Sequence, residues 1–297
     1  MTPHWTGVFP ACTTQLKRDQ SLDLPATARH LEALIESGVS GLIMCGSLGE
    51  NQTIEPDEKR AVIRCAVETA RGRVPVLSGV AESSTAAAIR YVRDVEKLGA
   101  AGVMLMPPMS YKGDPREATT YFRAVAKGGG LPIMIYNNPS SYANDITPAL
   151  FAELADESRF VALKESSGDP RRITELRNAV GDRYAVFTGV DDLLLESAIL
   201  GIDGWVAGSG IAFPKENQKL WQLTREGRWD EARALCRWAQ PLMKLDTHVH
   251  FVQYIKLIEQ EAGLGSEWVR EPRLPIAGAE REHVLKIIRD ALAKRPA

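Results

Sequence analysis

Eight short apolar runs, each followed by a longer amphipathic stretch, constrain the fold more than any other feature of this sequence. The runs have the length and β-branched content of buried strands, and the stretches between them carry apolar residues at helical spacing. A strand-then-helix unit that repeats eight times predicts an α/β fold with parallel strands, and it favours a closed (β/α)8 TIM barrel. The expected strands are 7–14, 41–46, 74–80, 101–108, 131–139, 160–166, 184–190 and 204–210.

The expected helices carry end signals. The segment 56–70 begins with a proline followed by two acidic residues, and the segment 84–98 starts on a serine and ends before Gly99. An open doubly wound sheet is the alternative architecture, but no GxGxxG turn follows the first strand to favour it. The other expected helices are 24–37, 115–127, 147–155, 170–180, 192–200 and 215–226.

The end of the chain has a different pattern. From about residue 227 only helical segments remain, at 229–243, 249–261 and 279–293. We therefore expect a catalytic barrel over residues 1–226 and a C-terminal helical extension over residues 227–297.

The composition narrows the class of protein. The chain has 297 residues, of which 44% are hydrophobic and 25% charged, and its net charge of −2 gives no electrostatic case for binding nucleic acid or an anionic membrane. Its four cysteines form no CxxC pair, which indicates reduced thiols in the cytoplasm. The first residues lack a signal-peptide pattern, and no run approaches the roughly 20 apolar residues of a membrane span. A cytoplasmic protein is expected.

One lysine stands in an unusual place. The stretch FVALKESSGD puts Lys164 at the end of an apolar run, although lysine is seldom buried without a partner. It could extend its ammonium to solvent, or it could be kept dry so that it becomes neutral and nucleophilic. Barrels carry their chemistry where strands end, and Tyr136 ends the neighbouring strand. We expect both side chains in one mouth, which favours the nucleophile.

Three motifs in order then identify a family. GSLGE at 46–50, YNNP at 136–139 and ALKESSGD at 162–169 resemble the family of dihydrodipicolinate synthase and N-acetylneuraminate lyase. The resemblance extends over the whole chain, helical extension included. It implies a class I enzyme that forms a lysine Schiff base, needs no cofactor or metal, and assembles as a homotetramer, a dimer of dimers.

The resemblance also implies roles for individual residues. Lys164 matches the Schiff-base lysine, and Tyr136 matches the tyrosine that moves protons beside it. Ser47 matches a loop hydroxyl, and the loop amides would hold the substrate carboxylate. The remaining loop residues expected to bind substrate are Gly46, Leu48 and Gly49.

Elementary chemistry supports these roles. A lysine with a pKa of about 10.4 is almost fully protonated at neutral pH, and desolvation lowers that pKa. The iminium that it forms with a 2-oxo acid acidifies the neighbouring carbon, and Tyr136 is placed to accept that proton. The alternatives are that Tyr136 is a packed core aromatic and that Ser47 is only a turn hydroxyl.

The sequence departs from the synthases at three places. A second loop threonine is replaced by Leu48, and Pro108 and Met109 stand where the synthases have a tyrosine that crosses a dimer interface. An arginine that grips the second substrate is absent from Ser140-Ser141-Tyr142. These departures argue against a role in lysine biosynthesis.

A second group of polar residues follows the last two strands. By resemblance to the neuraminate lyases, Gly189, Asp191, Asp192 and Ser209 would bind the polar tail of a substrate. The alternative for Asp191 or Asp192 is that it caps the following helix.

The full pattern is most similar to the subgroup of 1-pyrroline-4-hydroxy-2-carboxylate deaminases, which act in hydroxyproline breakdown. The predicted substrate is a small 2-oxo or cyclic imino acid, and the predicted products are 2-oxoglutarate semialdehyde and ammonia. The alternatives are a pyruvate-dependent aldolase and a 2-keto-3-deoxy sugar acid dehydratase. A sensor that only binds a small molecule would be expected to lack Lys164 or Tyr136, and both are present.

A metal site is a further alternative. The segment Asp246-Thr247-His248-Val249-His250 places two histidines at alternate positions, which on a strand could share a metal ion. Because the segment falls in the helical extension, residues two apart are expected to diverge, and no metal is predicted. His248 could instead contact substrate.

Overall fold

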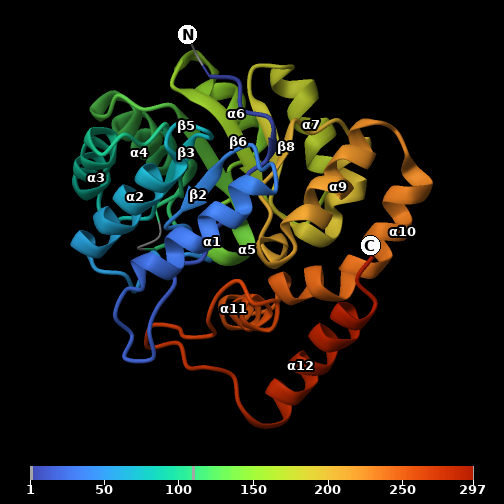
Figure 1. Ribbon diagram of the computed structural model, residues 1–297. Coiled ribbons are helices and arrows are strands. Elements are labelled where there is room, and N and C mark those ends of the chain that lie inside the picture. The colour runs from blue at the N-terminus through green and yellow to red at the C-terminus, as the bar shows by residue number, and fades with distance from the viewer. Residues whose placement is uncertain (1–2, 109–110, 297) are drawn as a thin grey trace.

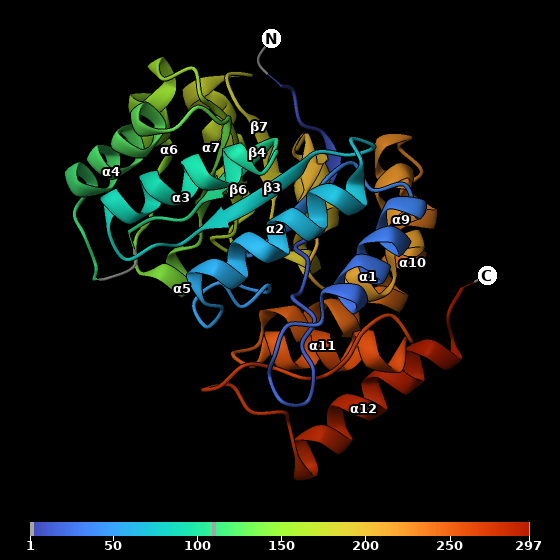
Figure 2. The same cartoon turned by 60° about the vertical axis from the view of Figure 1, so that its left-hand side comes forward.

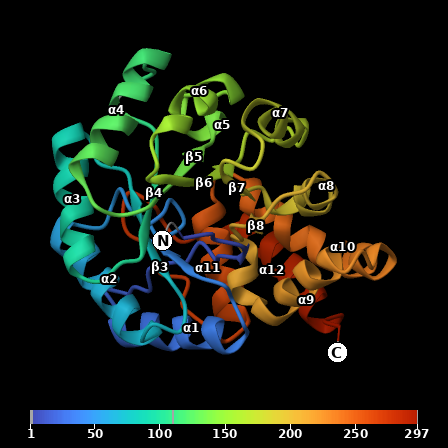
Figure 3. The same cartoon turned by 90° about the horizontal axis from the view of Figure 1, so that it is seen from above.

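The computed structural model describes residues 3–108 and 111–296, and it places eight parallel strands in one sheet in the order β1-β8-β7-β6-β5-β4-β3-β2. The sheet is curled, with the helices around it (Figure 3). The two ends of this order meet where Ala11 bridges Ile43. The fold is therefore TIM-barrel-like, as predicted. The strands are β1 (Gly7–Val8), β2 (Leu42–Met44), β3 (Val76–Val80), β4 (Gly102–Leu105), β5 (Ile133–Asn137), β6 (Phe160–Glu165), β7 (Ala185–Thr188) and β8 (Gly204–Trp205).

Helices cover the outside of the sheet (Figures 1 and 2). Each forms where the sequence predicts one, within a few residues at either end. They are α1 (Leu24–Glu36), α2 (Pro56–Ala70), α3 (Thr85–Lys97), α4 (Pro115–Gly128), α6 (Pro148–Glu153), α7 (Arg171–Val180), α8 (Leu194–Ile199) and α9 (Pro214–Arg225). One short helix was not predicted, α5 (Pro139–Tyr142), which directly follows β5.

Glycines let large aromatic side chains fill the barrel interior. The rings of Phe9 and Phe187 meet edge to face, with centroids 5.3 Å apart. A Cβ atom on Gly41 would stand 2.1 Å from the ring of Phe9, and one on Gly204 would stand 2.1 Å from that of Phe187. Phe187 is also the partner of Lys164 in the β6–β7 pairing, so this packed layer borders the lysine.

Three helices follow the barrel: α10 (Trp229–Met243), α11 (Phe251–Glu261) and α12 (Gly278–Ala293). α10 packs beside α9 at the side of the barrel, whereas α11 and α12 lie at the end of the barrel where α5 lies (Figures 1 and 2). Glu259 of α11 accepts hydrogen bonds from Thr13 and Gln15, both of which follow β1. The division of the chain at residue 227 stays a prediction. Within the described residues, no helix is long and apolar enough to cross a membrane.

Candidate active site

Lys164 and Tyr136 lie side by side on β6 and β5, where they are register partners. The Lys164 Nζ stands 4.1 Å from the centroid of the Tyr136 ring, a distance at which a cation is attracted to a π face. Both side chains are buried, with 6% and 5% of their surfaces exposed. Lys164 therefore does not reach solvent, so the simpler explanation of a solvent-seeking strand-end lysine is wrong.

Burial governs the ionisation of both groups. Desolvation lowers the pKa of Lys164, and negative charge at Tyr142, Asp246 and Asp191 opposes that shift. Desolvation also raises the pKa of Tyr136, so that this phenol is protonated in the resting site. A lysine that is easier to deprotonate is a better nucleophile toward a carbonyl carbon.

Gly189 and Ser166 border the lysine side chain. A Cβ atom on Gly189 would stand 2.2 Å from the Lys164 Cε and 2.3 Å from the Ser166 Oγ, so only glycine leaves the lysine its present position. The buried Ser166 hydroxyl has no well-formed hydrogen bond to another described residue. It nevertheless lies close enough to Tyr136 to lower the pKa of that phenol, against the larger effect of burial.

The loop after β2 is held from beneath by a buried ion pair. Glu50 takes the left-handed conformation, with φ of 60°, and its carboxylate accepts a hydrogen bond of 2.5 Å from Lys256 of α11. Thr14 donates to the carbonyl of Gly49 at 2.8 Å. Glu50 thus shapes the loop.

The upper part of the same loop presents free donors. The backbone amides of Ser47 and Leu48 donate no hydrogen bond to another described residue. Leu48 itself is buried, whereas Ser47 is half-buried and lines a cavity of about 130 Å³. A hydroxyl that lines a cavity, in a loop with two such amides, is suited to bind a carboxylate. Other residues that line the cavity are Ala81, Met106, Phe251 and Arg273.

Tyr142 reaches the same loop and was not predicted as a site residue. Its phenol contacts the Ser47 hydroxyl, and its ring meets that of Tyr136 edge to face with centroids 5.4 Å apart. It comes from α5, whose four residues are too few to show helical periodicity in the sequence. The only signal in the sequence is its place three residues after the YNNP motif.

The Asp191 carboxylate is hydrogen-bonded by other residues of the chain. Its carboxylate accepts hydrogen bonds from the Trp205 indole, from the amides of Gly208 and Ser209, and from the Ser209 hydroxyl at 2.6 Å. Neither Asp191 nor Asp192 caps α8, which has no side-chain cap, so the capping alternative is wrong. Asp192 is half-buried beside it. Substrate binding by Gly189, Asp191, Asp192 and Ser209 stays a prediction.

Asp246 is a second residue that sequence reasoning missed. It lies in the 3-10 turn Lys244–Thr247, and a Cβ atom on Gly208 would stand 2.5 Å from its Oδ1. Desolvation, together with the charge of Asp191, raises the pKa of Asp246 well above its usual range, while Lys164 acts in the opposite direction. The structure therefore groups Asp246 with Lys164 and separates it from the histidines that follow it in sequence.

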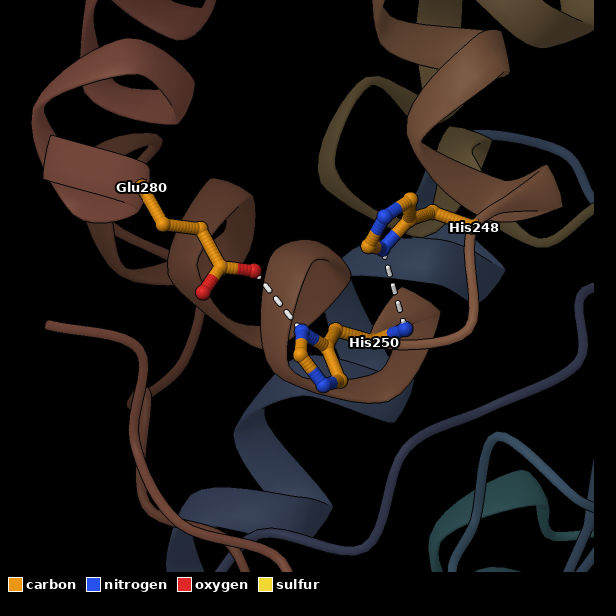
Figure 4. Close-up of side chains that lie close together, drawn as sticks. All are labelled: His248, His250 and Glu280. Atoms are coloured by element: carbon orange, nitrogen blue, oxygen red, sulfur yellow. Dashed lines mark hydrogen bonds and ion pairs between the residues drawn. The ribbon is translucent and has the colours of Figure 1, made fainter.

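Those histidines come together, contrary to the prediction that they diverge. His248, His250 and Glu280 place their potential ligand atoms within 4.8 Å of one another (Figure 4). They converge because His248 has extended backbone, with φ of −86° and ψ of 156°, so the segment is not helical there. His250 Nδ1 lies 2.7 Å from Glu280, which also accepts from Tyr254 at 2.6 Å. The three residues pair with one another and do not line the cavity beside Ser47.

A buried lysine at the carboxyl end of a barrel strand, in contact with a phenol and close to free amide donors, defines a class of enzyme: the class I lyases, which form an imine with a carbonyl substrate. Comparison with known proteins agrees. The profile of the dihydrodipicolinate synthetase family matches residues 4–291. This chain belongs to that family, whose members are lysine Schiff-base lyases, and it is an enzyme of that class.

Individual relatives share the full length of the chain. The 4-hydroxy-tetrahydrodipicolinate synthase of Xanthomonas campestris pv. campestris is 31% identical over 291 residues, which cover 97% of this chain and 95% of that protein. The enzyme of the same name from Sphingopyxis alaskensis is 32% identical over 280 residues, covering 93% and 95%.

Solved structures are similar throughout. Dihydrodipicolinate synthase from Aquifex aeolicus has a TM-score of 0.91 at 27% identity, with 97% of each chain covered. The Acinetobacter baumannii synthase, solved in complex with pyruvate, has a TM-score of 0.92 at 25% identity, covering 97% of this chain and 99% of that one.

Proposed function

We propose that this enzyme converts 1-pyrroline-4-hydroxy-2-carboxylate into 2-oxoglutarate semialdehyde and ammonia, with Lys164 as the Schiff-base nucleophile. The observation that carries the lysine assignment is the burial of Lys164 against the ring of Tyr136. The choice of substrate rests on the sequence pattern of the deaminase subgroup and on the departures from the synthases.

The reaction begins at the cyclic imine. Neutral Lys164 attacks the imine carbon and opens the ring, so that one imine is exchanged for another and the ring nitrogen leaves carbon 2 as an amine. The carboxylate on that carbon is held by the amides of Ser47 and Leu48. Tyr136 then removes a proton from carbon 3, and the electron pair of that bond forms an enamine.

The second half expels two groups. The 4-hydroxyl takes a proton and leaves the enamine as water. An unsaturated iminium then remains on Lys164. Tautomerisation then transfers two hydrogens, one from carbon 5 and one from its amine, to carbons 3 and 4. This places a new imine at carbon 5 while the imine to Lys164 stays, and water hydrolyses the new imine and releases ammonia. A second water hydrolyses the bond to Lys164 and frees 2-oxoglutarate semialdehyde. We expect the active species to be a homotetramer, which light scattering at micromolar concentration would test.

A second candidate is 4-hydroxy-tetrahydrodipicolinate synthesis, which the names of the relatives favour. Three features of this chain argue against it. Leu48 replaces a hydroxyl of the loop, no arginine occurs at residues 139–142, and no tyrosine occupies 108 or 109. Met109 lies outside the described residues, so for that position the argument is one of sequence alone.

Product analysis separates the candidates. The protein is mixed with 1-pyrroline-4-hydroxy-2-carboxylate, and ammonia and 2-oxoglutarate semialdehyde are followed together. Equal amounts of both are expected from the native protein and from Lys97→Ala, an exposed lysine, but neither product from Lys164→Ala. If the native protein gives neither product, the deaminase assignment is wrong. Pyruvate with borohydride then tests whether Lys164 forms an imine. In a separate assay with pyruvate and aspartate semialdehyde, formation of 4-hydroxy-tetrahydrodipicolinate would identify a synthase.

A further inference from the structure

The helix α5 connects Tyr142 to Tyr136 through one side chain. Asn138 caps the helix, since its Oδ1 accepts the Ser141 amide at 3.0 Å. The Nδ2 of the same residue donates to the Tyr136 hydroxyl at 3.1 Å. The turn that carries Tyr142 is therefore fixed relative to the phenol that faces Lys164.

The other end of the turn is held as well. Buried Asn144 donates from its Nδ2 to the carbonyl of Tyr142 at 3.2 Å and to that of Pro108 at 2.8 Å. Between them, Ala143 takes the left-handed conformation with φ of 58°. A backbone anchored on both sides fixes the direction of the Tyr142 side chain.

The Tyr142 side chain connects Tyr136 with Ser47. The Tyr142 hydroxyl contacts the Ser47 hydroxyl, and it also lies close enough to the Tyr136 hydroxyl to lower the pKa of that phenol. The two rings of Tyr142 and Tyr136 meet at 80°. Tyr142 and Ser47 both line the cavity, whereas Lys164 and Tyr136 do not. Tyr142 is thus the side chain that touches the enclosed phenol on one side and the cavity on the other.

We propose that Tyr142 completes a proton relay within one chain, running from Tyr136 through Tyr142 to Ser47. The inference rests on the proposed function, because it requires that a proton be removed beside an iminium on Lys164. Each of the three hydroxyls can donate one hydrogen bond and accept others, so a proton can pass along the row without leaving a charge on any member. Tyr142 is a positioning and relay residue, and it need not touch the reacting carbon.

Every proton that moves in the elimination can be accounted for by the hydroxyls of Tyr136, Tyr142 and Ser47. The proton from carbon 3 bonds to the Tyr136 oxygen, and Tyr136 passes a proton to Tyr142 as Tyr142 passes its own to Ser47. Ser47 gives its proton to the departing 4-hydroxyl, which leaves as water. The electron pair of the carbon–hydrogen bond ends in the unsaturated iminium, so no outside acid or base is consumed.

The hydroxyl of Tyr142 is the testable part of this row. If Tyr142 only packed against Tyr136, a phenylalanine would serve equally well. Burial raises the pKa of Tyr142, so its hydroxyl stays protonated and available as a donor. The variant Tyr142→Phe removes one oxygen and keeps the ring. The control Tyr254→Phe removes a phenol oxygen that donates to Glu280 in the helical extension.

Pyruvate in deuterium oxide isolates the relay from the rest of the reaction. Imine formation on Lys164 is measured by borohydride trapping and mass spectrometry, and proton removal by exchange of the pyruvate methyl hydrogens with solvent. For Tyr142→Phe we expect trapping within about twofold of the native protein and an unchanged KM for pyruvate. Exchange should fall by about 100-fold, the usual size of a general acid–base contribution. Ser47→Ala should lose exchange in the same way, and Tyr254→Phe should match the native protein.

The outcomes distinguish the two levels of the proposal. Native protein that neither traps nor exchanges pyruvate contradicts Lys164 as the nucleophile, and the relay falls with it. Native protein that does both, together with Tyr142→Phe that exchanges at the native rate, overturns the relay alone. A variant that loses trapping and exchange in equal measure also overturns it, because Tyr142 would then build the site and not move the proton.

Discussion

The Nζ atom of Lys164 lies 4.1 Å from the ring centroid of Tyr136, its register partner on the adjacent strand. The ring gives a protonated lysine a partner in a buried place, because the face of an aromatic ring carries partial negative charge. Desolvation nevertheless dominates and lowers the pKa of Lys164. Burial thus makes the charged lysine costly to accommodate and leaves the neutral lysine ready to react.

Removing the ammonium should leave a more stable but inactive protein. In the folded state the pKa of Lys164 lies below its unfolded value, so the unfolded chain binds the proton more tightly. Lys164 therefore destabilises the fold below its folded pKa, and this penalty is relieved as pH rises from the folded pKa toward the unfolded one. We expect Lys164→Met to raise the free energy of unfolding at neutral pH, measured in urea, and to abolish trapping with pyruvate.

The pH dependence supplies the control for that experiment. The stability difference between Lys164→Met and the native protein should shrink as pH rises from the folded to the unfolded pKa of the lysine, and the charge penalty should vanish above the unfolded pKa, where the side chain is neutral in both states. A difference that is constant across this range would mean that shape, and not charge, sets the effect.

Gly189→Ala should displace the nucleophile without removing it. The new methyl group would stand 2.2 Å from the Lys164 Cε, and the flexible lysine is the neighbour that can move away. We expect at least a tenfold loss in the rate of borohydride trapping, with a loss of stability of about 1–3 kcal/mol from overpacking. Gly113→Ala is a matched control, since its nearest neighbour is the end of the Glu117 side chain at 3.1 Å. Native trapping by Gly189→Ala would contradict this role of the glycine.

Asp246→Asn should shift the pH profile of imine formation toward acid. The charge of Asp246 raises the pKa of Lys164, so its removal lets desolvation lower that pKa further. More of the lysine is then neutral at a given pH, and the acid limb of the trapping rate moves to lower pH. A rate that rises a few-fold at neutral pH is the expected result, with exposed Asp230→Asn unchanged. A shift toward alkaline pH would mean that Asp246 assists deprotonation of the lysine.

The sequence predicts regular elements well here because they repeat. The segment 56–70 forms a helix over those same residues, since its caps and periodicity are local properties. Expected strands are longer than the observed ones where backbone conformation changes without a change in polarity. After Met44, for example, the chain leaves β2 through Cys45, which has φ of 51° although it is as buried as the strand.

The parts of the site that were missed depend on contacts between distant segments. Tyr142 and Ser47 are 95 positions apart, and nothing in either local pattern signals that their hydroxyls meet. Asp246 acts on Lys164 because the 3-10 turn Lys244–Thr247 packs against the turn Asp191–Leu193, which follows β7. His248 and His250 were predicted to diverge because a helix was assumed, whereas α11 begins after them at Phe251. Lys164 and Tyr136 were found because both end predicted neighbouring strands.

The buried ion pair of Glu50 and Lys256 should be the strongest interaction between the loop 46–50 and the helical extension. Both side chains are fully buried, and Lys256 also donates to the carbonyl of Trp268 at 2.7 Å. Glu50→Ala would leave an unpaired ammonium in the interior, so we expect it to lower the free energy of unfolding by about 3–5 kcal/mol. The exposed pair of Lys286 and Asp290 is the control, and Asp290→Ala should cost no more than about 1 kcal/mol.

A double substitution separates charge from packing at this pair. Glu50→Leu with Lys256→Met removes both charges and keeps apolar volume, so urea unfolding should show most of the lost stability restored. Trapping with pyruvate should stay impaired in the same variant, because the amide of Arg270 loses the Glu50 carboxylate that it contacts at 2.8 Å and the loop that carries Ser47 loses its support. Full recovery of both stability and trapping would show that Glu50 holds the loop by volume alone.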